Sequence, residues 1–325
     1  MHLIRSLIIC SLLISLSIYA PYKAFFDQVP QNKNLVINIE RGDTIYEVFS
    51  LFLPINFANK LFLKIYSLRN DINLIQYGEY QIANKSILEI INLIKSGETI
   101  THKLKINEGL NIYDIENLIN DSYLINDCSF LKCIDTNLSF REGILYPDTY
   151  FYKKGMSASE ILNESHARLE NYLNNKLKNK STYTSLNKEE VLILASIIEK
   201  EAGNDNEKSK IASVFLKRLS IGMRLQADPT IIYGLLPNFD GDIKKSDILD
   251  SNNKFNTYMI KGLPPTPISI SSPSSIDAAV NSLPGEFLFF VADSPTSHYF
   301  SRTYDEHKKK VNELNRKWRS SHLRV

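Results

Sequence analysis

The chain has 325 residues, of which 43% are hydrophobic and 23% are charged, and its formal net charge is +2. This length fits one medium-sized or two small globular domains. The nearly neutral charge gives no electrostatic footprint of a nucleic-acid-binding protein, so nucleic acid is not an expected partner.

The N-terminal segment is uncharged and largely apolar between Arg5 and Lys23. Its length is at the short end for a membrane span, and it also fits the core of a signal peptide. Because Ile18 and Pro21 do not suit signal-peptide cleavage, we expect a retained anchor over residues 1–25 with Arg5 on the cytoplasmic side. A cleaved signal peptide is the alternative. Both interpretations place the rest of the chain outside the cytoplasm.

Residues 26–100 alternate between strand and helix patterns. Apolar and polar residues alternate over 35–40 and 77–82, which predicts two short strands. A helical pattern follows each strand, and the second helix runs from a cap at Ser86 to a stop at Gly97. This order predicts a small α+β unit.

Residues 101–325 combine more helices with a few strands. Helical patterns cover a segment around Ile115 and Leu118, residues 157–176, residues 190–202 after a cap at Asn187, and about 204–219. Strand patterns cover 101–106, 287–292 and 298–300, and the second of these is apolar enough to predict burial. Residues 228–273 are rich in Pro, Gly and Asn, and 305–325 form a basic helix or tail. The predicted fold class of the chain is therefore α+β.

The reactive residue types exclude several chemistries. Cys128 and Cys133 have no partnering His, so they do not form a zinc site. They form a disulfide in an oxidising compartment or remain free thiols in a reducing one. The 6 His are scattered, and the sequence contains no His-Glu-x-x-His, P-loop or Gly-x-Ser-x-Gly motif. No metal or other cofactor is expected.

One predicted helix is apolar nearly all round and yet ends in two carboxylates, Glu199 and Glu201. Leu194, Ile197 and Ile198 precede Glu201 by seven, four and three residues and therefore surround it on the helix surface. Desolvation raises the pKa of a carboxyl group, which makes Glu201 the better candidate for a proton donor near neutral pH. The alternative is that both carboxylates extend into solvent at the helix end.

Several segments, in series, closely resemble the motifs of the YceG-like family of endolytic murein transglycosylases. The segments are 142–150, 195–202, 212–219, 221–230, 256–258, 262–265 and 291–293. The resemblance extends from the N-terminal segment to about His307. At 269–273 the chain departs from the Asn-Pro-Gly that the family usually shows, which leaves the role of that loop open.

The resemblance implies a domain organisation and an activity. It implies a transmembrane anchor over 1–25, a LysM-like subdomain over 26–100 and a catalytic domain over 101–325. Such a protein is anchored once in the inner membrane, with its catalytic domain in the periplasm. It cuts peptidoglycan glycan strands internally during cell-wall synthesis and leaves 1,6-anhydro-muramic acid ends, and peptidoglycan synthases are candidate partners.

The resemblance also assigns Glu201, the second Glu of the Glu-x-Glu motif, as the acid and then the base of this non-hydrolytic reaction. Amide, hydroxyl, carboxyl and Tyr side chains near the motifs are the expected substrate contacts, although the same residues are common in ordinary turns. These candidates are Tyr146, Asp148, Tyr150, Glu199, Gln226, Asp228, Thr230, Tyr233, Asn256 and Tyr258.

Two other functions stay open at this point. One is a muramidase that hydrolyses the same bond, with Glu199 or Asp228 as its second carboxylate. The other is a non-catalytic protein that binds the cell wall or acts as a scaffold.

Overall fold

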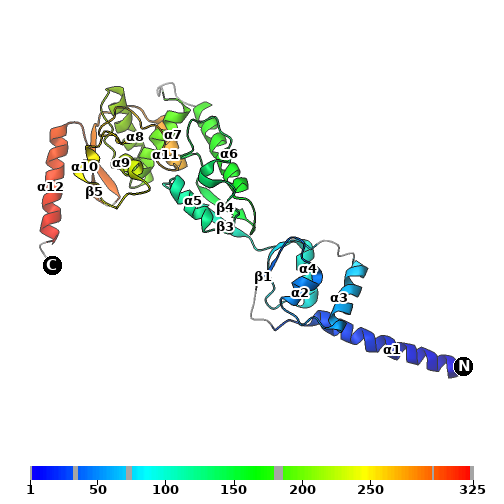
Figure 1. Ribbon diagram of the computed structural model, residues 1–325. Helices are drawn as coiled ribbons and strands as arrows, with labels where there is room; N and C mark the ends of the chain where they lie inside the picture. Colours follow the sequence, from blue (N-terminus) through cyan, green and yellow to red (C-terminus); the bar gives the residue numbers. More distant parts are fainter. Residues whose placement is uncertain (1, 32–35, 71–74, 179–185, 295, 323–325) are drawn as a thin grey trace. The chain divides into compact units, whose positions relative to one another are not determined.

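The chain has a mixed α+β structure in a computed structural model that describes residues 2–31, 36–70, 75–178, 186–294 and 296–322 (Figure 1). It divides into two compact units. Unit 1 comprises Met1–His102 and Phe151–Met156, and unit 2 comprises Lys103–Tyr150 and Ser157–Val325.

The segment Phe151–Met156 belongs to unit 1, although it lies between two segments of unit 2 along the chain. The reason is a set of contacts made by its lysines. Lys154 Nζ lies 2.8 Å from a carboxylate oxygen of Glu79, and Lys153 Nζ donates to the carbonyl of Gly97 at 3.3 Å.

The first helix, α1 (His2–Asp27), contains Pro21 and ends against the core of unit 1. The Tyr22 ring lies 5.6 Å from Phe62, and the Phe26 ring lies 4.8 Å from Tyr66. Among the helices that the structure describes, none combines the length and the apolar character needed to cross a membrane.

Unit 1 contains two paired strands and three further helices. These are β1 (Val36–Ile39), α2 (Ile45–Ser50), α3 (Phe57–Asn70), β2 (Gly78–Gln81) and α4 (Ile87–Ser96). The strands are antiparallel, and Ile37 is opposite Tyr80. The sequence prediction for α4 is confirmed, because Ser86 caps it in a capping box and Gly97 ends it in a left-handed conformation at φ 71°.

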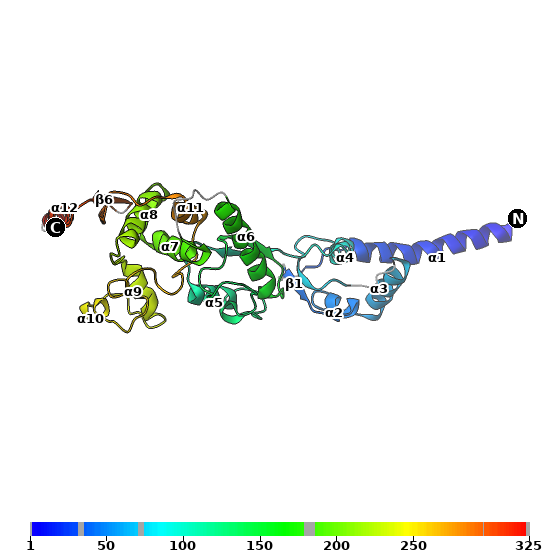
Figure 2. The same cartoon turned by 90° about the horizontal axis from the view of Figure 1, so that it is seen from above.

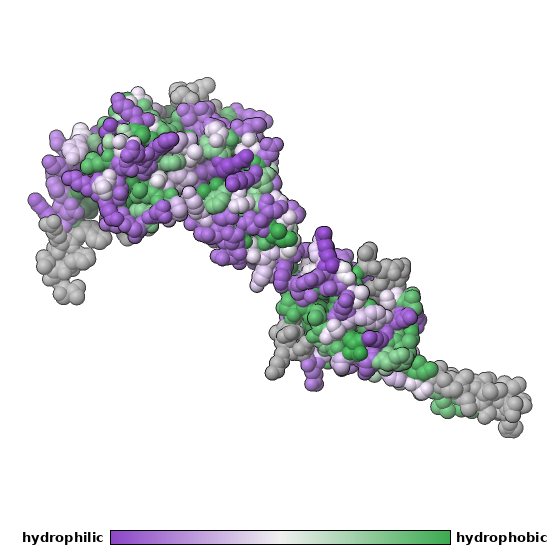
Figure 3. Space-filling model, in the orientation of Figure 1, coloured by the Kyte–Doolittle hydropathy of each residue, from purple (hydrophilic) through white to green (hydrophobic). Residues whose placement is uncertain are grey.

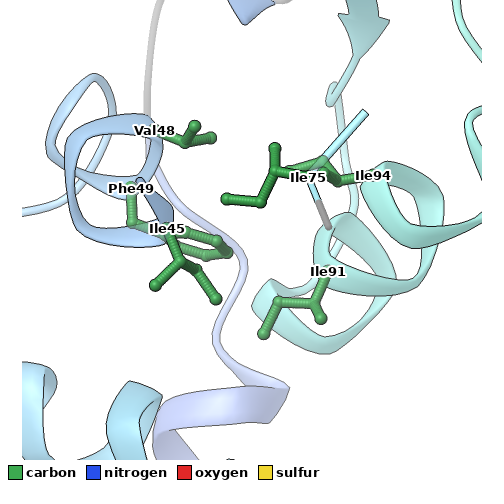
Figure 4. Close-up of a pocket in the computed structure, with 6 residues that line it drawn as sticks. All are labelled: Ile45, Val48, Phe49, Ile75, Ile91 and Ile94. Atoms are coloured by element: carbon green, nitrogen blue, oxygen red, sulfur yellow. The ribbon is translucent and has the colours of Figure 1, made fainter. Parts of the chain in front are cut away.

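A small apolar cavity lies between α2 and α4 in unit 1 (Figure 4). Its volume is about 10 Å³, and its lining residues are Ile45, Val48, Phe49, Ile75, Ile91 and Ile94. A space of this size holds at most one water molecule and offers that water no polar partner. This cavity is therefore a packing defect and not a site for a sugar.

Unit 2 contains most of the helices and most of two small sheets, although the strand residues His102, Phe151 and Tyr152 belong to unit 1. The sheets pair β3 (His102–Ile106) with β4 (Asp148–Tyr152), and β5 (Phe289–Ser294) with β6 (Ser297–Ser301). The α-helices are α5 (Ile112–Asn120), α6 (Ala158–Lys178), α7 (Lys188–Glu201), α8 (Asp205–Ser220), α9 (Asp228–Leu235), α10 (Lys245–Ile248), α11 (Pro273–Asn281) and α12 (Tyr304–His322).

Helix α7 is at the centre of this unit, where α7, α8 and α11 pack against one another (Figures 1 and 2). Every residue from 191 to 198 is buried, as its continuous apolar pattern predicted. The predicted cap is also confirmed, because the Asn187 side chain accepts from Glu190 N at 2.9 Å. This packing fixes the end of α7, and with it the position of Glu201.

Two sequence predictions for unit 2 were wrong or incomplete. The Pro-rich stretch 228–273 contains α9, because Pro229 in the first turn of a helix favours its start. Strand β5 was expected to be buried, but its residues are half-buried or exposed. A sheet of only two strands leaves much of its surface open, although Phe290 packs on Phe215 and Phe289 stacks on His307.

Cys128 and Cys133 form a disulfide, with a distance of 5.0 Å between their Cα atoms. This settles the alternative that the sequence left open. Within the described residues, no group of His, Cys, Asp or Glu side chains is arranged to hold a metal ion.

Candidate active site

Glu201, the last residue of α7, has a carboxyl group without a hydrogen-bonding partner. The residue is half-buried, and its carboxyl makes no hydrogen bond or ion pair with any residue that the structure describes. After Glu201 the backbone leaves the helix, since Ala202 is extended at φ −77° and ψ 127°. The carboxyl is therefore held by a rigid helix and left available to a ligand.

The surroundings of Glu201 favour its protonated form. Burial and, to a smaller extent, the nearby negative charge of Asp228 together raise the pKa of this carboxyl to about 8, against an opposing effect of Arg218. A carboxyl group with a pKa in this range can donate a proton at neutral pH. Glu201 therefore does not simply extend into solvent at the helix end.

Asp228 and Tyr258 form a pair beside Glu201. The Tyr258 hydroxyl donates to Oδ1 of the exposed Asp228 at 2.7 Å. Burial raises the pKa of Tyr258, and the charges of Asp228 and Glu201 raise it as well. Because Asp228 is the first residue of α9, the start of this helix sets the position of its carboxylate. Two acidic side chains and one phenol thus meet at one place on the surface of unit 2.

Arg218 supplies the positive charge near this group. It is almost fully buried, and its guanidinium donates to the carbonyl of Leu288 at 2.7 Å and to the carbonyl of Leu225. Burial lowers the pKa of Arg218, whereas Tyr258 and Glu201 raise it. The guanidinium is fixed by backbone carbonyls and is not neutralised by a direct ion pair with Glu201.

Gln226 precedes this pair in a strained backbone conformation. Its φ is +52°, a region that residues other than glycine rarely adopt, and its side chain is exposed. The Gln226 amide donates to the carbonyl of Thr257 at 3.2 Å, and the neighbouring Ala227 amide donates to Thr257 Oγ1 at 2.9 Å. Strain of this kind is common where a side chain is held ready for a ligand.

Two other predicted contact residues are buried and hold this segment together. Thr230 is fully buried, and its hydroxyl donates to the carbonyl of Ala227 at 2.6 Å. Asn256 is also fully buried, and its Nδ2 donates to the carbonyls of Asp247, Ile248 and Asp250. These side chains support the site, and we do not include them among its ligand contacts.

Glu199 lies on a different side of α7 and is occupied by other protein groups. Its carboxylate accepts from the amide and hydroxyl of Ser272, from Ser275 Oγ at 2.6 Å and from Lys208 Nζ. Burial alone would raise the pKa of Glu199, but these hydrogen bonds and the Lys208 charge together lower it. Glu199 therefore remains ionised and ties α7 to α8 and α11.

The hydrogen-bond network of Glu199 includes the segment at 269–273, where the sequence departs from the family pattern. Ser272 caps α11, and Pro273 occupies its first turn. Lys208 Nζ donates to Ser272 Oγ at 2.8 Å and lies 2.8 Å from Asp205 Oδ1. In this chain the loop is a buried polar junction between helices.

Tyr146, Asp148 and Tyr150 form a separate cluster around Arg168 of α6. Arg168 pairs with Asp148 at 2.6 Å, and its guanidinium lies 5.1 Å from the Tyr146 ring and 5.6 Å from the Tyr150 ring. Tyr150 is buried, with its hydroxyl donating to the carbonyl of Tyr146 at 2.9 Å. Their contacts are with α6, whereas Gln226, Asp228 and Tyr258 are grouped near the end of α7.

Glu142 is a functional candidate that no sequence motif predicted. It is only 4% exposed, and its carboxylate accepts from Ile112 N at 2.9 Å, from Gly143 N at 2.9 Å and from the Tyr233 hydroxyl at 2.8 Å. Burial, with a smaller contribution from the charge of Asp114, raises the pKa of Glu142 to about 7 despite the opposing effect of the three donors. The signal in the sequence was an acidic residue directly before the apolar segment that contains Ile144.

Tyr233, which was predicted to contact substrate, is therefore bonded to Glu142. Its ring also packs against Phe255 at 4.7 Å. Since Tyr233 belongs to α9, the hydrogen bond to Glu142 links α9 to the start of α5 at Ile112. This link holds the helix whose first residue is Asp228.

The family can now be assigned from comparison with known sequences. The model of the YceG-like family matches residues 37–313. The chain belongs to this family.

Two similar curated proteins carry the same name. The endolytic murein transglycosylase of Bacillus subtilis (strain 168) is 34% identical over 173 residues, which are 52% of this chain and 46% of that protein. The endolytic murein transglycosylase of Streptococcus pneumoniae serotype 2 (strain D39) is 30% identical over 192 residues, which are 55% of this chain and 33% of that protein. The chain thus spans less than half of the length of these relatives.

The fold of this family member is also similar to a solved structure. A crystal structure of a yceG-like protein from Listeria monocytogenes aligns with a TM-score of 0.54 at 27% sequence identity. The alignment covers 84% of this chain and 97% of that structure. The similarity therefore includes most of the α+β architecture.

Proposed function

We propose that this YceG-like protein is an endolytic peptidoglycan lytic transglycosylase and that Glu201 is its acid and base. The observation that carries the proposal is the state of the Glu201 carboxyl, which has a pKa of about 8 and no hydrogen bond to the described residues. The names of the two relatives, both endolytic murein transglycosylases, support the same activity.

The reaction needs one titrating carboxyl group. Protonated Glu201 donates its proton to the glycosidic oxygen between N-acetylmuramic acid and N-acetylglucosamine, and the bond from this oxygen to the anomeric carbon breaks. The Glu201 carboxylate then takes the proton of the muramic acid 6-hydroxyl, whose oxygen attacks the same anomeric carbon. The product has a 1,6-anhydro end, no water is consumed, and Glu201 is protonated again.

The groups around Glu201 have separate tasks in this proposal. Asp228 adds to the effect of burial and raises the pKa of Glu201 through like-charge repulsion, and its exposed carboxylate can stabilise the positive charge that develops on the sugar ring. Gln226 and Tyr258 offer an amide and a hydroxyl to the sugar, on a backbone that is held before the substrate arrives.

A hydrolytic muramidase is the second candidate, because Asp228 is an exposed carboxylate close to Glu201. Such an enzyme uses a second carboxylate to activate water. Glu199 does not suit this role, since Lys208 and two serines already occupy its carboxylate. The two reactions leave different ends on the muramic acid, so their products separate them.

We further propose that residues 1–25 anchor the chain in the inner membrane and that unit 1 is a LysM-like subdomain in the periplasm. The uncharged apolar run between Arg5 and Lys23 supports the anchor. The order β1, α2, α3, β2 with antiparallel strands supports the subdomain. Peptidoglycan strands are the proposed substrate, and peptidoglycan synthases remain candidate partners. Protease protection of the chain in spheroplasts, compared with lysed cells, tests the location.

Substitution of Glu201 tests the enzymatic proposal. Glu201→Gln keeps the shape of the side chain and removes its titration, so digestion of purified glycan strands is expected to fall by about a thousandfold or more. Glu160→Gln, on the exposed surface of α6, is the matched control and is expected to digest like the native chain. Unchanged digestion by Glu201→Gln contradicts the assignment of Glu201, and a native chain that digests no glycan leaves only a wall-binding or scaffold role.

A further inference from the structure

Helix α3 of unit 1 carries apolar side chains on two opposite faces. Its inner face contributes the fully buried Leu63 to the core. On its outer face, Phe57 is 84% exposed, Leu68 is 75% exposed and Leu61 is 43% exposed. A surface helix ordinarily presents polar residues to water, so this outer face is suited to a partner that takes apolar groups.

The most exposed apolar residues of α3 point in similar directions, with Lys64 at the edge between Leu61 and Leu68. Phe57, Leu61 and Leu68, called here the α3 stripe, are separated by four and seven residues. At 3.6 residues per turn, their directions fall within about 40° of one another around the helix. The exposed Ala58 and half-buried Ile65 widen the stripe on one side.

Basic side chains border the α3 stripe on both edges. Lys60 and Lys64 follow one edge and Arg69 the other, and all three, called here the basic rim, are exposed. Helix α3 contains no acidic residue. On the side of unit 1 where α3 lies, hydrophobic and hydrophilic surface alternate (Figure 3). An apolar stripe between basic residues is typical of a helix that lies in a membrane interface, where lysine stems extend along apolar surface towards lipid phosphates.

The position of α3 next to α1 agrees with such a partner. The contacts of Tyr22 with Phe62 and of Phe26 with Tyr66 join the last turns of α1 to α3 (Figures 1 and 2). Just before these turns, the large apolar residue Tyr19 is exposed on α1. Helix α3 is thus attached to the end of the segment that we propose as the membrane anchor.

We propose that the outer face of α3 lies in the interface of an anionic phospholipid bilayer and holds unit 1 against the membrane surface. The α3 stripe enters the boundary between headgroups and acyl chains, and the basic rim contacts lipid phosphates. This inference rests on the membrane attachment proposed above, but not on the enzymatic activity.

Fluorescence of a single tryptophan in the full chain tests the proposal. The only native tryptophan is removed by Trp318→Phe, and Phe57→Trp places the probe in the α3 stripe. The chain is reconstituted into vesicles of phosphatidylcholine and phosphatidylglycerol, with or without brominated acyl chains. The brominated lipids are expected to quench the tryptophan at 57 and iodide in the water to quench it weakly.

The control probe lies on the same unit beside β2. Tyr77→Trp replaces a residue that is about half exposed and whose ring lies 4.5 Å from Arg41. This probe is expected to respond to iodide and not to brominated lipid. Replacing the three residues of the basic rim by Gln, or omitting phosphatidylglycerol, is expected to reduce the lipid quenching at 57 by about twofold or more.

The possible results separate the proposals from one another. Equal iodide quenching at 57 and 77 with no lipid quenching overturns the α3 proposal, even if the chain floats with the vesicles. A probe at 57 that is shielded from iodide but not quenched by lipid also overturns it, because another protein chain then covers the stripe. If the chain does not float with the vesicles, both the anchor and the α3 proposal fail, whereas glycan digestion is judged independently.

Discussion

Glu199 and Glu201 are two residues apart at the end of one helix, and their environments shift their pKa values in opposite directions. Glu199 faces Lys208 and the serines that precede and begin α11, which lower its pKa. Glu201 is desolvated and lies near Asp228, and these two effects raise the pKa of Glu201 to about 8. Because a helix rotates by about 200° over two residues, one carboxylate joins helices and the other remains reactive.

The first prediction concerns the buried partner of Glu199. Glu199→Ala removes the buried counterion of the Lys208 ammonium, since both of these side chains are less than one-tenth exposed, and leaves Lys208 only its ion pair with the exposed Asp205. We expect a loss of about 3 kcal/mol in the free energy of unfolding, measured by denaturant titration near neutral pH. The exposed Glu160→Ala is the control and is expected to change stability by less than about 0.5 kcal/mol. A stability equal to that of the native chain would show that the Lys208 network does not hold α7.

The same pair predicts a pH dependence. A lowered pKa means that Glu199 stabilises the fold when it is ionised. Its contribution to the free energy of unfolding is complete above the pKa of about 4.5 in the unfolded chain, and it is lost as the pH falls through the lower pKa of the folded chain. The difference in melting temperature between the native chain and Glu199→Gln is therefore expected to shrink on acidification. A difference that stays constant between neutral and acidic pH would contradict the ion pair.

For Glu201, the raised pKa predicts that stability changes with pH in the opposite direction. Its raised pKa means that the native chain loses stability as the pH rises from about 4.5 to about 8, because the carboxyl ionises in the unfolded chain while burial keeps it protonated in the folded chain. Glu201→Gln does not titrate, so we expect it to be increasingly more stable than the native chain over this range, by at most about 5 kcal/mol. Melting temperatures of both chains across this pH range provide the measurement, and equal pH dependence would contradict the raised pKa.

Asp228 predicts a shift in the pH dependence of activity. Glu201 must be protonated to begin the reaction, so kcat/KM is expected to fall as the pH rises through about 8. Asp228→Asn removes the like charge and should move this fall to lower pH by about 0.5 to 1 unit. Asp240 forms an exposed ion pair with Lys244, and Asp240→Asn is the control. This variant should leave the pH at which kcat/KM falls unchanged. A profile that does not move in Asp228→Asn rejects the electrostatic role of Asp228.

The Tyr233 hydroxyl predicts a structural effect on α9. Tyr233→Phe removes one of three donors to the buried Glu142 carboxylate, so we expect a loss of about 1 to 2 kcal/mol in stability and a further rise in the pKa of Glu142. Tyr172→Phe is a matched comparison, since that hydroxyl donates to Asp277 at the same 2.8 Å distance but lies outside α9. If the Tyr233–Glu142 hydrogen bond positions α9, only Tyr233→Phe reduces glycan digestion. Equal digestion by both variants would contradict this role of the hydrogen bond.

Local features of the fold were predictable from the sequence, whereas contacts between distant segments were not. Caps at Asn187 and Ser86 depend on residues three positions away, so the pattern alone located both helices. The periodicity of α7 also favoured Glu201 over Glu199 as the desolvated carboxyl. The partner of Glu199 is a lysine on the next helix, and periodicity contains no information on such pairs.

Contacts between distant segments also explain why the sequence did not predict Glu142 as a site residue. Its donors at Ile112 and Tyr233 are 30 and 91 residues away along the chain. Helix α9 was not recognised because its Asp-Pro start lies in a stretch rich in Pro, Gly and Asn. Conversely, Thr230 and Asn256 had the chemistry of sugar contacts, but only the fold shows that both are buried.

Mass spectrometry of the ends that the enzyme leaves on purified glycan strands tests the central claim most directly. We predict that the native chain produces internal cuts with 1,6-anhydro-muramic acid ends, which are lighter by one water than reducing ends. Glu201→Gln is predicted to produce neither kind of end. Reducing muramic acid ends from the native chain, or anhydro ends that persist in Glu201→Gln, would contradict the account of Glu201 as acid and base of a non-hydrolytic cut.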